Sequence, residues 1–128
     1  DYTTLCNNAP GEILATIAMR NATTLLQRNH RIVLENLSLA EKFFKKHKKL
    51  LHWIQPNGGS TAFPQLHRPF DVTEMCERAM NEKELLIIGE RAFGVTTNNF
   101  RVGLGRLDFK EALDVFSEII EDMEQKIS

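Results

Sequence analysis

The spacing of apolar residues changes twice along this chain, and these changes limit the folds that it can adopt. In two long segments apolar residues recur every three or four positions, the spacing of one face of an α-helix. Between them, short apolar runs are separated by glycine, proline and asparagine, as in strands joined by turns. The helical positions are Val33, Leu37, Ala40 and Phe44, and then Phe109, Leu113, Phe116, Ile120, Met123 and Ile127. The spacing predicts helices combined with strands.

Turn and capping residues divide the chain further. Asn57-Gly58 lies between two strand-like runs and predicts a hairpin. Asp71 and Asp108 each precede a glutamate by three residues, close to the capping-box pattern at a helix start. The predicted helices span 11–28, 29–49, a short segment after Asp71 and the segment after Asp108, and single strands span 84–88 and 100–105. This order predicts an α+β fold in which a small, mostly antiparallel sheet is covered by helices.

The composition is that of one ordinary globular domain. The 128 residues are 42% hydrophobic and 26% charged, with a formal net charge of -1, so no overall positive field indicates nucleic acid. No apolar run of about 18 residues predicts a membrane span. Cys6 and Cys76 form no disulfide framework, which favours a reducing, cytoplasmic location. The four histidines show no zinc-ligand spacing, so no metal site is predicted.

A basic run, "KKHKK", ends the second predicted helix at Lys45–Lys49. Such a run is compatible with a nucleic-acid patch or with a solvated helix C-terminus, where cations are favourable. The second interpretation is preferred because no aromatic platform or further basic cluster accompanies the run in the sequence.

Arg101 raises a different question, because it lies inside the apolar, strand-like run "FRVGLG". A buried guanidinium without a partner is costly. Arg101 therefore either occupies the solvated face of the sheet or meets an anion. Arg106, just beyond the strand and before the last helix, is expected to be exposed.

Three motifs occur in a fixed order along the chain. The first is an aromatic strand before the turn Pro56–Gly59, the second a strand and loop that end in Phe93-Gly94, and the third the "RVGLG" strand from Arg101. With the opening "DYTTLCNNAP", these motifs closely resemble the C-terminal part of fold-type-I aminotransferases, the pyridoxal phosphate (PLP) enzymes of the class I/II group. The likeness extends over essentially the whole chain.

The resemblance implies roles for two residues. Arg101 matches the arginine that binds the α-carboxylate of the amino acid or 2-oxo acid substrate in that family. Asn7 lies in the segment that reaches toward the partner subunit's PLP phosphate in relatives, which are dimers; the alternative is a simple turn asparagine. Residues 1–28 would be a remnant of the large PLP-binding domain, and 29–128 the small C-terminal domain, with 29–49 as the interdomain helix.

The same resemblance places the Schiff-base lysine upstream of the "DYTT" segment. No catalytic residue is therefore expected in this sequence, which we interpret as part of a longer chain and expect to be inactive alone. The dipeptide Ile88-Gly89 replaces the usual Pro-Gly before the F-G loop. Two alternatives stay open: a PLP lyase, decarboxylase or epimerase with this fold, and a non-enzymatic α+β binding module.

Overall fold

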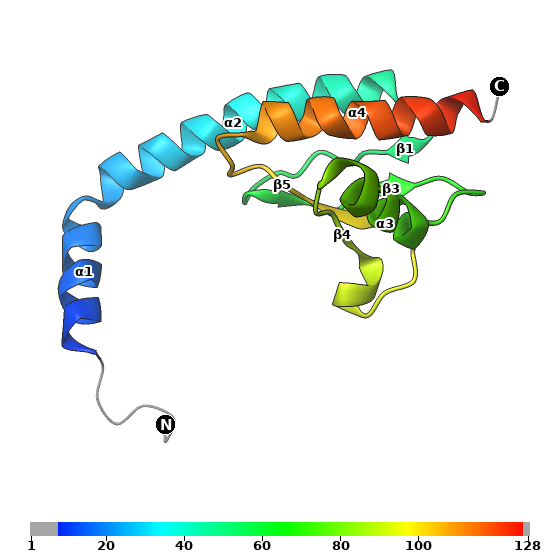
Figure 1. Cartoon of the computed structure of the whole chain (residues 1–128). Coiled ribbons are helices and arrows are strands. Elements are labelled where there is room, and N and C mark those ends of the chain that lie inside the picture. The colour runs from blue at the N-terminus through cyan, green and yellow to red at the C-terminus, as the bar shows by residue number, and fades with distance from the viewer. Residues whose placement is uncertain (1–7, 127–128) are drawn as a thin grey trace. The chain divides into compact units, whose positions relative to one another are not determined.

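The computed structural model describes residues 8–126. The chain divides into two compact units, one up to Arg31 and one from Ile32. The elements are α1 (Ala9–Arg20), α2 (Ala22–Lys46), β1 (Leu51–His52), β2 (Thr61–Ala62), β3 (Gln65–Leu66), α3 (Val72–Lys83), β4 (Ile88–Gly89), the 3-10 helix η1 (Glu90–Phe93), β5 (Phe100–Gly103) and α4 (Phe109–Gln125), as Figure 1 shows. No helix in this described range is long and apolar enough to cross a membrane.

The first helix ends earlier than its apolar spacing predicted. The break falls at Asn21, not at 28–29, and α2 runs through the predicted boundary. The reason is local: the Asn21 side chain donates to the Ile17 carbonyl at 2.8 Å, and such a bond competes with the helical ladder. Residues 8–20 are all exposed, including Ile13, Leu14 and Ile17.

The second unit has the predicted α+β architecture. Among the described residues β2, β5 and β4 form a three-stranded sheet with β5 in the centre, and β1 pairs with β3. All of these pairs are antiparallel. In the larger sheet Ala62 lies opposite Val102, and Ile88 lies opposite Arg101.

The predicted hairpin around Pro56–Gly59 is wrong. β1 and β2, which flank this turn, lie in separate sheets, because β1 pairs with β3 and β2 pairs with β5. Residues 53–60 form a wide loop between them, with Gly59 at a φ of 76° that favours glycine. The predicted strand over 84–88 is also shorter, since only Ile88 and Gly89 pair with β5.

The core lies on one face of the larger sheet. Phe100 is 1% exposed, and its ring lies 6.5 Å from that of Phe44 on α2 and 5.6 Å from that of Phe116 on α4. On the same face a Cβ at Gly89 would lie 3.4 Å from Cys76 Sγ on α3. Three helices therefore cover the Phe100 face. Because side chains alternate along a strand, Arg101 belongs to the opposite face.

The two predicted caps have different outcomes. Asp71 caps α3, since its Oδ1 accepts the Thr73 N–H at 2.7 Å. Asp108 precedes α4 but makes no capping bond, because both of its carboxylate oxygens bind the Arg106 guanidinium, at 2.8 and 2.6 Å.

Candidate functional site

Arg101 lies on the open face of the sheet, in the central strand β5. Its side chain is exposed and makes no hydrogen bond or ion pair with any other residue in the range 8–126. Both possibilities considered for this cation are therefore met in part: it is solvated, and it remains available for an anion from outside the described chain. A guanidinium offers a planar fork that suits a carboxylate with two parallel hydrogen bonds.

One phenylalanine, Phe63, lies beside this cation, and a second packs against Phe63. Ala62 is opposite Val102, and the Phe100 N–H donates to the Pro64 carbonyl at 3.0 Å, so the register places Phe63 across from Arg101. Cross-strand neighbours share a face, and Phe63 and Arg101 therefore lie side by side. The Phe63 ring meets the ring of Phe93 edge to face at 5.2 Å. Both rings are partly exposed, at 39% and 45%, so Phe63 places apolar surface on the same face of the sheet as Arg101.

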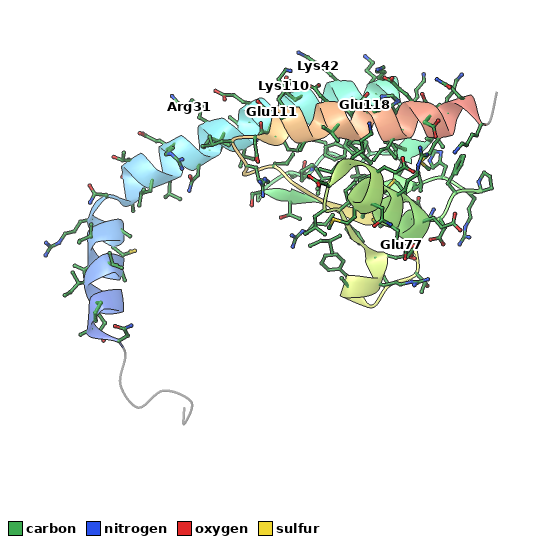
Figure 2. All side chains as sticks on the ribbon, viewed as in Figure 1. Arg31, Lys42, Glu77, Lys110, Glu111 and Glu118 are labelled. Carbon is green, nitrogen blue, oxygen red and sulfur yellow. The ribbon has the colours of Figure 1, made fainter. Side chains whose placement is uncertain are left out.

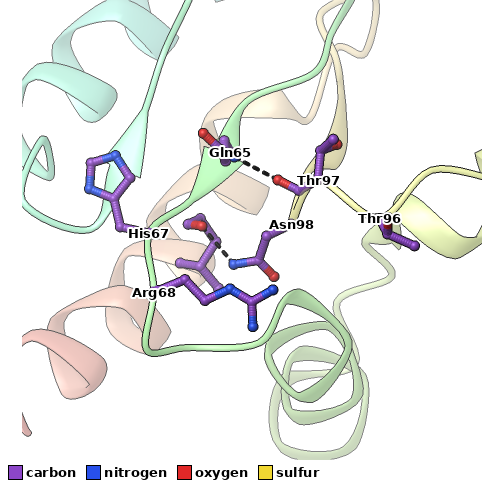
Figure 3. Close-up of a pocket in the computed structure, with 7 residues that line it drawn as sticks. Gln65, His67, Arg68, Thr96, Thr97 and Asn98 are labelled. Atoms are coloured by element: carbon purple, nitrogen blue, oxygen red, sulfur yellow. Dashed lines mark hydrogen bonds between the residues drawn. The ribbon is translucent and has the colours of Figure 1, made fainter.

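The backbone that leads into β5 is held by Asn98. This residue is 5% exposed and has a left-handed φ of 62°. Its Oδ1 accepts the Val72 N–H at 2.9 Å, and its Nδ2 donates to the carbonyls of Leu66 at 2.6 Å and Phe70 at 2.9 Å. Figure 3 shows the Asn98 side chain between the segment 65–68 and the segment 96–98. One amide thus ties β3, the start of α3 and the entry of β5 together.

Glu90 also fixes the backbone that leads into β5. Its Oε2 accepts the backbone N–H of Asn98 and, at 3.4 Å, that of Asn99. The Asn99 side chain in turn donates to the Phe63 carbonyl at 2.9 Å. These residues were not predicted from the sequence, because "NN" before a strand indicates only a turn. The tolerance of asparagine for left-handed backbone was the signal available.

Arg106 is the nearest competing cation, and it is occupied. It is 70% exposed, as predicted, and it forms a bidentate pair with Asp108. The hydrogen bond from Arg106 holds the pKa of the Asp108 carboxyl below its usual value. Since Arg101 has no such partner among the described residues, it is the better candidate for an incoming carboxylate.

A hollow of about 390 Å³ lies beside β5. It is bordered by 84–87, by β5 from Phe100 to Gly103 and by the first turns of α4 up to Phe116. The described residues that line it include two arginines, Arg101 and Arg106, but no lysine. This part of the chain therefore offers a carboxylate contact and apolar walls, and it does not offer the lysine that a PLP Schiff base requires.

The other predicted cofactor contact, Asn7, lies outside the described residues. No group of three or more His, Cys, Asp or Glu within 8–126 is arranged to hold a metal ion. The described residues thus fit one side of a substrate site and do not by themselves fit PLP.

Comparisons with known proteins agree with this description. No protein-family profile matches the chain. Capreomycidine synthase from Streptomyces vinaceus is 30% identical over 127 aligned residues, which cover 92% of this chain and 31% of that protein. The structure of a PLP-dependent cyclase, OrfR, superimposes with a TM-score of 0.84 at 26% identity, over 96% of this chain and 34% of that one.

An aminotransferase structure superimposes equally well. A PLP-dependent aminotransferase from Streptococcus suis gives a TM-score of 0.85 at 22% identity, over 95% of this chain and 33% of that one. The chain thus spans about a third of the length of each of these relatives. The predicted resemblance is confirmed: the chain has the fold of one part of the PLP-dependent aminotransferases and of the related cyclase.

Proposed function

We propose that this chain is the substrate-carboxylate-binding part of a PLP-dependent aminotransferase that moves an amino group between an amino acid and a 2-oxo acid. The observation that carries the proposal is Arg101, an exposed cation without a partner among the described residues, in the central strand of a sheet whose other face is covered. Its role here is to bind and orient the substrate, because a bidentate carboxylate fixes the position of the adjoining carbon.

The neighbouring residues support this role. Phe63, whose ring packs against Phe93, places apolar surface on the same face as Arg101, and apolar surface strengthens a charge-assisted bond by lowering the local dielectric constant. Asn98 and Glu90 fix the backbone just before Arg101 and so limit the positions that its guanidinium can reach. The cofactor and its lysine belong, in this proposal, to another part of the protein.

The division of the chain and its setting are parts of the same proposal. Residues 1–28 would be a remnant of the large domain and 29–128 the small domain, joined by the helix that includes 29–46. A homodimer in the cytoplasm is the expected state, with Asn7 near the partner's PLP phosphate. The resemblance supports these points, and the exposed apolar residues of α1 are compatible with a further domain there.

A cyclase is the second candidate. It is favoured by the identities, because the two relatives at 26% and 30% are a PLP-dependent cyclase and capreomycidine synthase, whereas the aminotransferase from Streptococcus suis is 22% identical. Arg101 would hold an amino acid carboxylate in either reaction. The two candidates differ in whether a 2-oxo acid is also a substrate.

Carboxylate binding can be tested on this chain directly. Pyruvate is titrated into isotopically labelled protein while NMR follows the arginine Nε–H signals. We expect a saturable shift at Arg101, with a dissociation constant on the order of 10 mM because one exposed arginine binds weakly. Methyl pyruvate, which lacks the charge, should leave the signal in place. Equal responses at Arg101 and Arg106 would contradict the proposal.

A further inference from the structure

A second concave surface lies away from Arg101, between the C-terminal part of α2 and the segment that follows it. It encloses about 670 Å³ and is lined by Lys42, Lys45, Lys48, Phe44, His52 and Trp53, together with Leu51, Gln55 and Glu41. We call it the lysine groove. All of its residues belong to the second compact unit. Phe44 lines both this groove and the hollow beside Arg101, but the charged residues of the groove are not part of that hollow.

The lysine groove carries more positive than negative charge, with three lysines and one glutamate in its lining. Lys42 and Lys45 stand three residues apart on α2, so their Cα atoms are separated by about 4.5 Å along the helix axis, and Lys48 lies two residues beyond the end of α2. None of the three forms an ion pair within the described part of the chain, whereas neighbouring Lys46 pairs with Glu121 at 2.6 Å. Figure 2 shows Lys42 projecting outward from α2. Glu41 is the one carboxylate in the lining.

The groove also has an aromatic component, which the sequence analysis did not foresee. The ring of Trp53 stacks on that of Phe44 with centroids 4.3 Å apart and an interplanar angle of 9°. Trp53 is half-buried and lines the groove. The basic run was assigned to a solvated helix end because no aromatic group accompanied it in the sequence. The fold corrects that premise, since the return of the chain after Leu51 brings an indole to the lysines.

The Trp53 Nε1–H is the third feature. It is buried and has no hydrogen-bond partner among the described residues. A buried donor without an acceptor is unusual in a native protein and calls for an explanation, such as a ligand or a water molecule. An oxygen atom of an anion that enters the groove would satisfy this donor once the side chains that cover it move.

We propose that the lysine groove binds a nucleoside polyphosphate, with the phosphates on Lys42, Lys45 and Lys48 and the base against Trp53. Ammonium groups are effective point charges for phosphate oxygens, and an indole is a sequence-tolerant platform for a base. The volume suits a small ligand. This site is separate from the proposed carboxylate site, so the failure of one proposal would leave the other unaffected.

The test uses the labelled chain and NMR titrations with three probes: ATP without metal, inorganic pyrophosphate and adenosine. We expect ATP to shift the Trp53 Nε1–H signal and the amides of 42–48 saturably, with an affinity at least about tenfold above that of either other probe. Because the attraction is largely electrostatic, raising the salt from about 0.05 to 0.5 M should weaken it.

Two sets of variants complete the test. Replacing Lys42, Lys45 and Lys48 together by Gln should weaken ATP binding at least about tenfold. Replacing Lys83, Lys110 and Lys126 by Gln changes the net charge equally outside the groove and should have less than a twofold effect. Trp53→Leu should reduce the affinity for ATP to that for pyrophosphate; Trp53→Phe serves if the leucine variant does not fold.

Three results would overturn the proposal. They are the lack of saturable shifts at about 10 mM ATP, equal affinities for ATP and pyrophosphate, and an equal loss of binding in the two triple variants. The amide spectrum of each variant shows whether its fold is intact.

Discussion

Asn98 accepts the backbone N–H of Val72 through its Oδ1 at 2.9 Å, and this bond joins the start of α3 to the residue that leads into β5. Val72 is fully buried and Asn98 nearly so. The contact spans a sequence separation of 26 residues. It therefore couples the stability of the fold to the placement of Arg101, three residues further along.

Substitutions at Asn98 should separate the contribution of its side-chain hydrogen bonds from that of its left-handed backbone. Asn98→Ala removes the bonds to three buried backbone groups and places alanine at a φ of 62°. We expect its free energy of unfolding to fall by about 2–4 kcal/mol. Asn98→Gly keeps the backbone conformation and should lose about 1 kcal/mol less. Urea denaturation measures both; an equal loss in the two variants would show that the left-handed backbone contributes nothing.

The Asp71 cap predicts a dependence of stability on pH. The pKa of its carboxyl is lowered from 3.8, chiefly by the hydrogen bond from the Thr73 N–H. A lowered pKa in the folded state means that this contribution is present above about pH 4 and is lost as the pH falls through the folded-state value. Asp71→Ala should cost about 1 kcal/mol at pH 7, and less at pH 3.

A control for this experiment is Asp114→Ala on α4, where an exposed carboxylate pairs with Lys110. It should change stability by less than about 0.5 kcal/mol at either pH. If Asp71→Ala lowers the free energy of unfolding as much at pH 3 as at pH 7, the cap does not act through the charged carboxylate.

The capping prediction also shows how far the sequence alone could go. Asp71 and the apolar spacing of α4 identified two helices correctly because caps and helix faces depend on residues a few positions apart. The sequence left open whether Arg101 lies on the solvated face or meets an anion, and strand alternation explains why it lies on the face opposite Phe100. The same local reasoning failed at Asp108, where Arg106 competes for the carboxylate.

The remaining features depend on contacts between distant segments. The turn at Pro56–Gly59 predicts a hairpin, but the pairing of β2 with β5 and of β1 with β3 separates the flanking strands. Asn98 can bind the backbone only because the fold brings Leu66, Phe70 and Val72 around its side chain. Trp53 reaches the lysines of α2 only through the fold. A pattern of neighbouring residues in the sequence does not show which distant segments come into contact.

The exposed apolar residues of α1 predict association. Ile13, Leu14 and Ile17 are 62%, 66% and 51% exposed. Exposed apolar surface of this kind favours contact with other molecules, so the chain should associate as its concentration rises. In light scattering, the triple variant with Gln at these three positions should have a molecular mass closer to that of a monomer. The control Ile54→Gln, at a single exposed residue of the second unit, should have the same mass as the wild type. A monomeric wild type at about 10 mg/ml would count against this.

Among the described residues no lysine lines the hollow beside Arg101, so the chain should not capture PLP covalently. Incubation with PLP, borohydride reduction and mass spectrometry should show no stoichiometric adduct, although scattered labelling of exposed lysines is expected at high PLP. A single lysine modified to completion would show that the described chain carries its own cofactor site.

The central claim is that Arg101 binds a substrate carboxylate and does not hold the fold together. The most direct measurement uses the longer enzyme to which this chain is proposed to belong. It compares kcat/KM for an amino acid and for the matching amine without a carboxylate, in the wild type and in Arg101→Lys, with the thermal midpoint as a folding control. Lysine keeps the charge and loses the fork.

We predict that kcat/KM for the amino acid falls by roughly thirtyfold to a thousandfold, equivalent to about 2–4 kcal/mol, while the value for the amine and the thermal midpoint hardly change. Equal losses for the two substrates, or a midpoint of the longer enzyme lower by more than about 5 °C, would make Arg101 a structural residue and contradict the account.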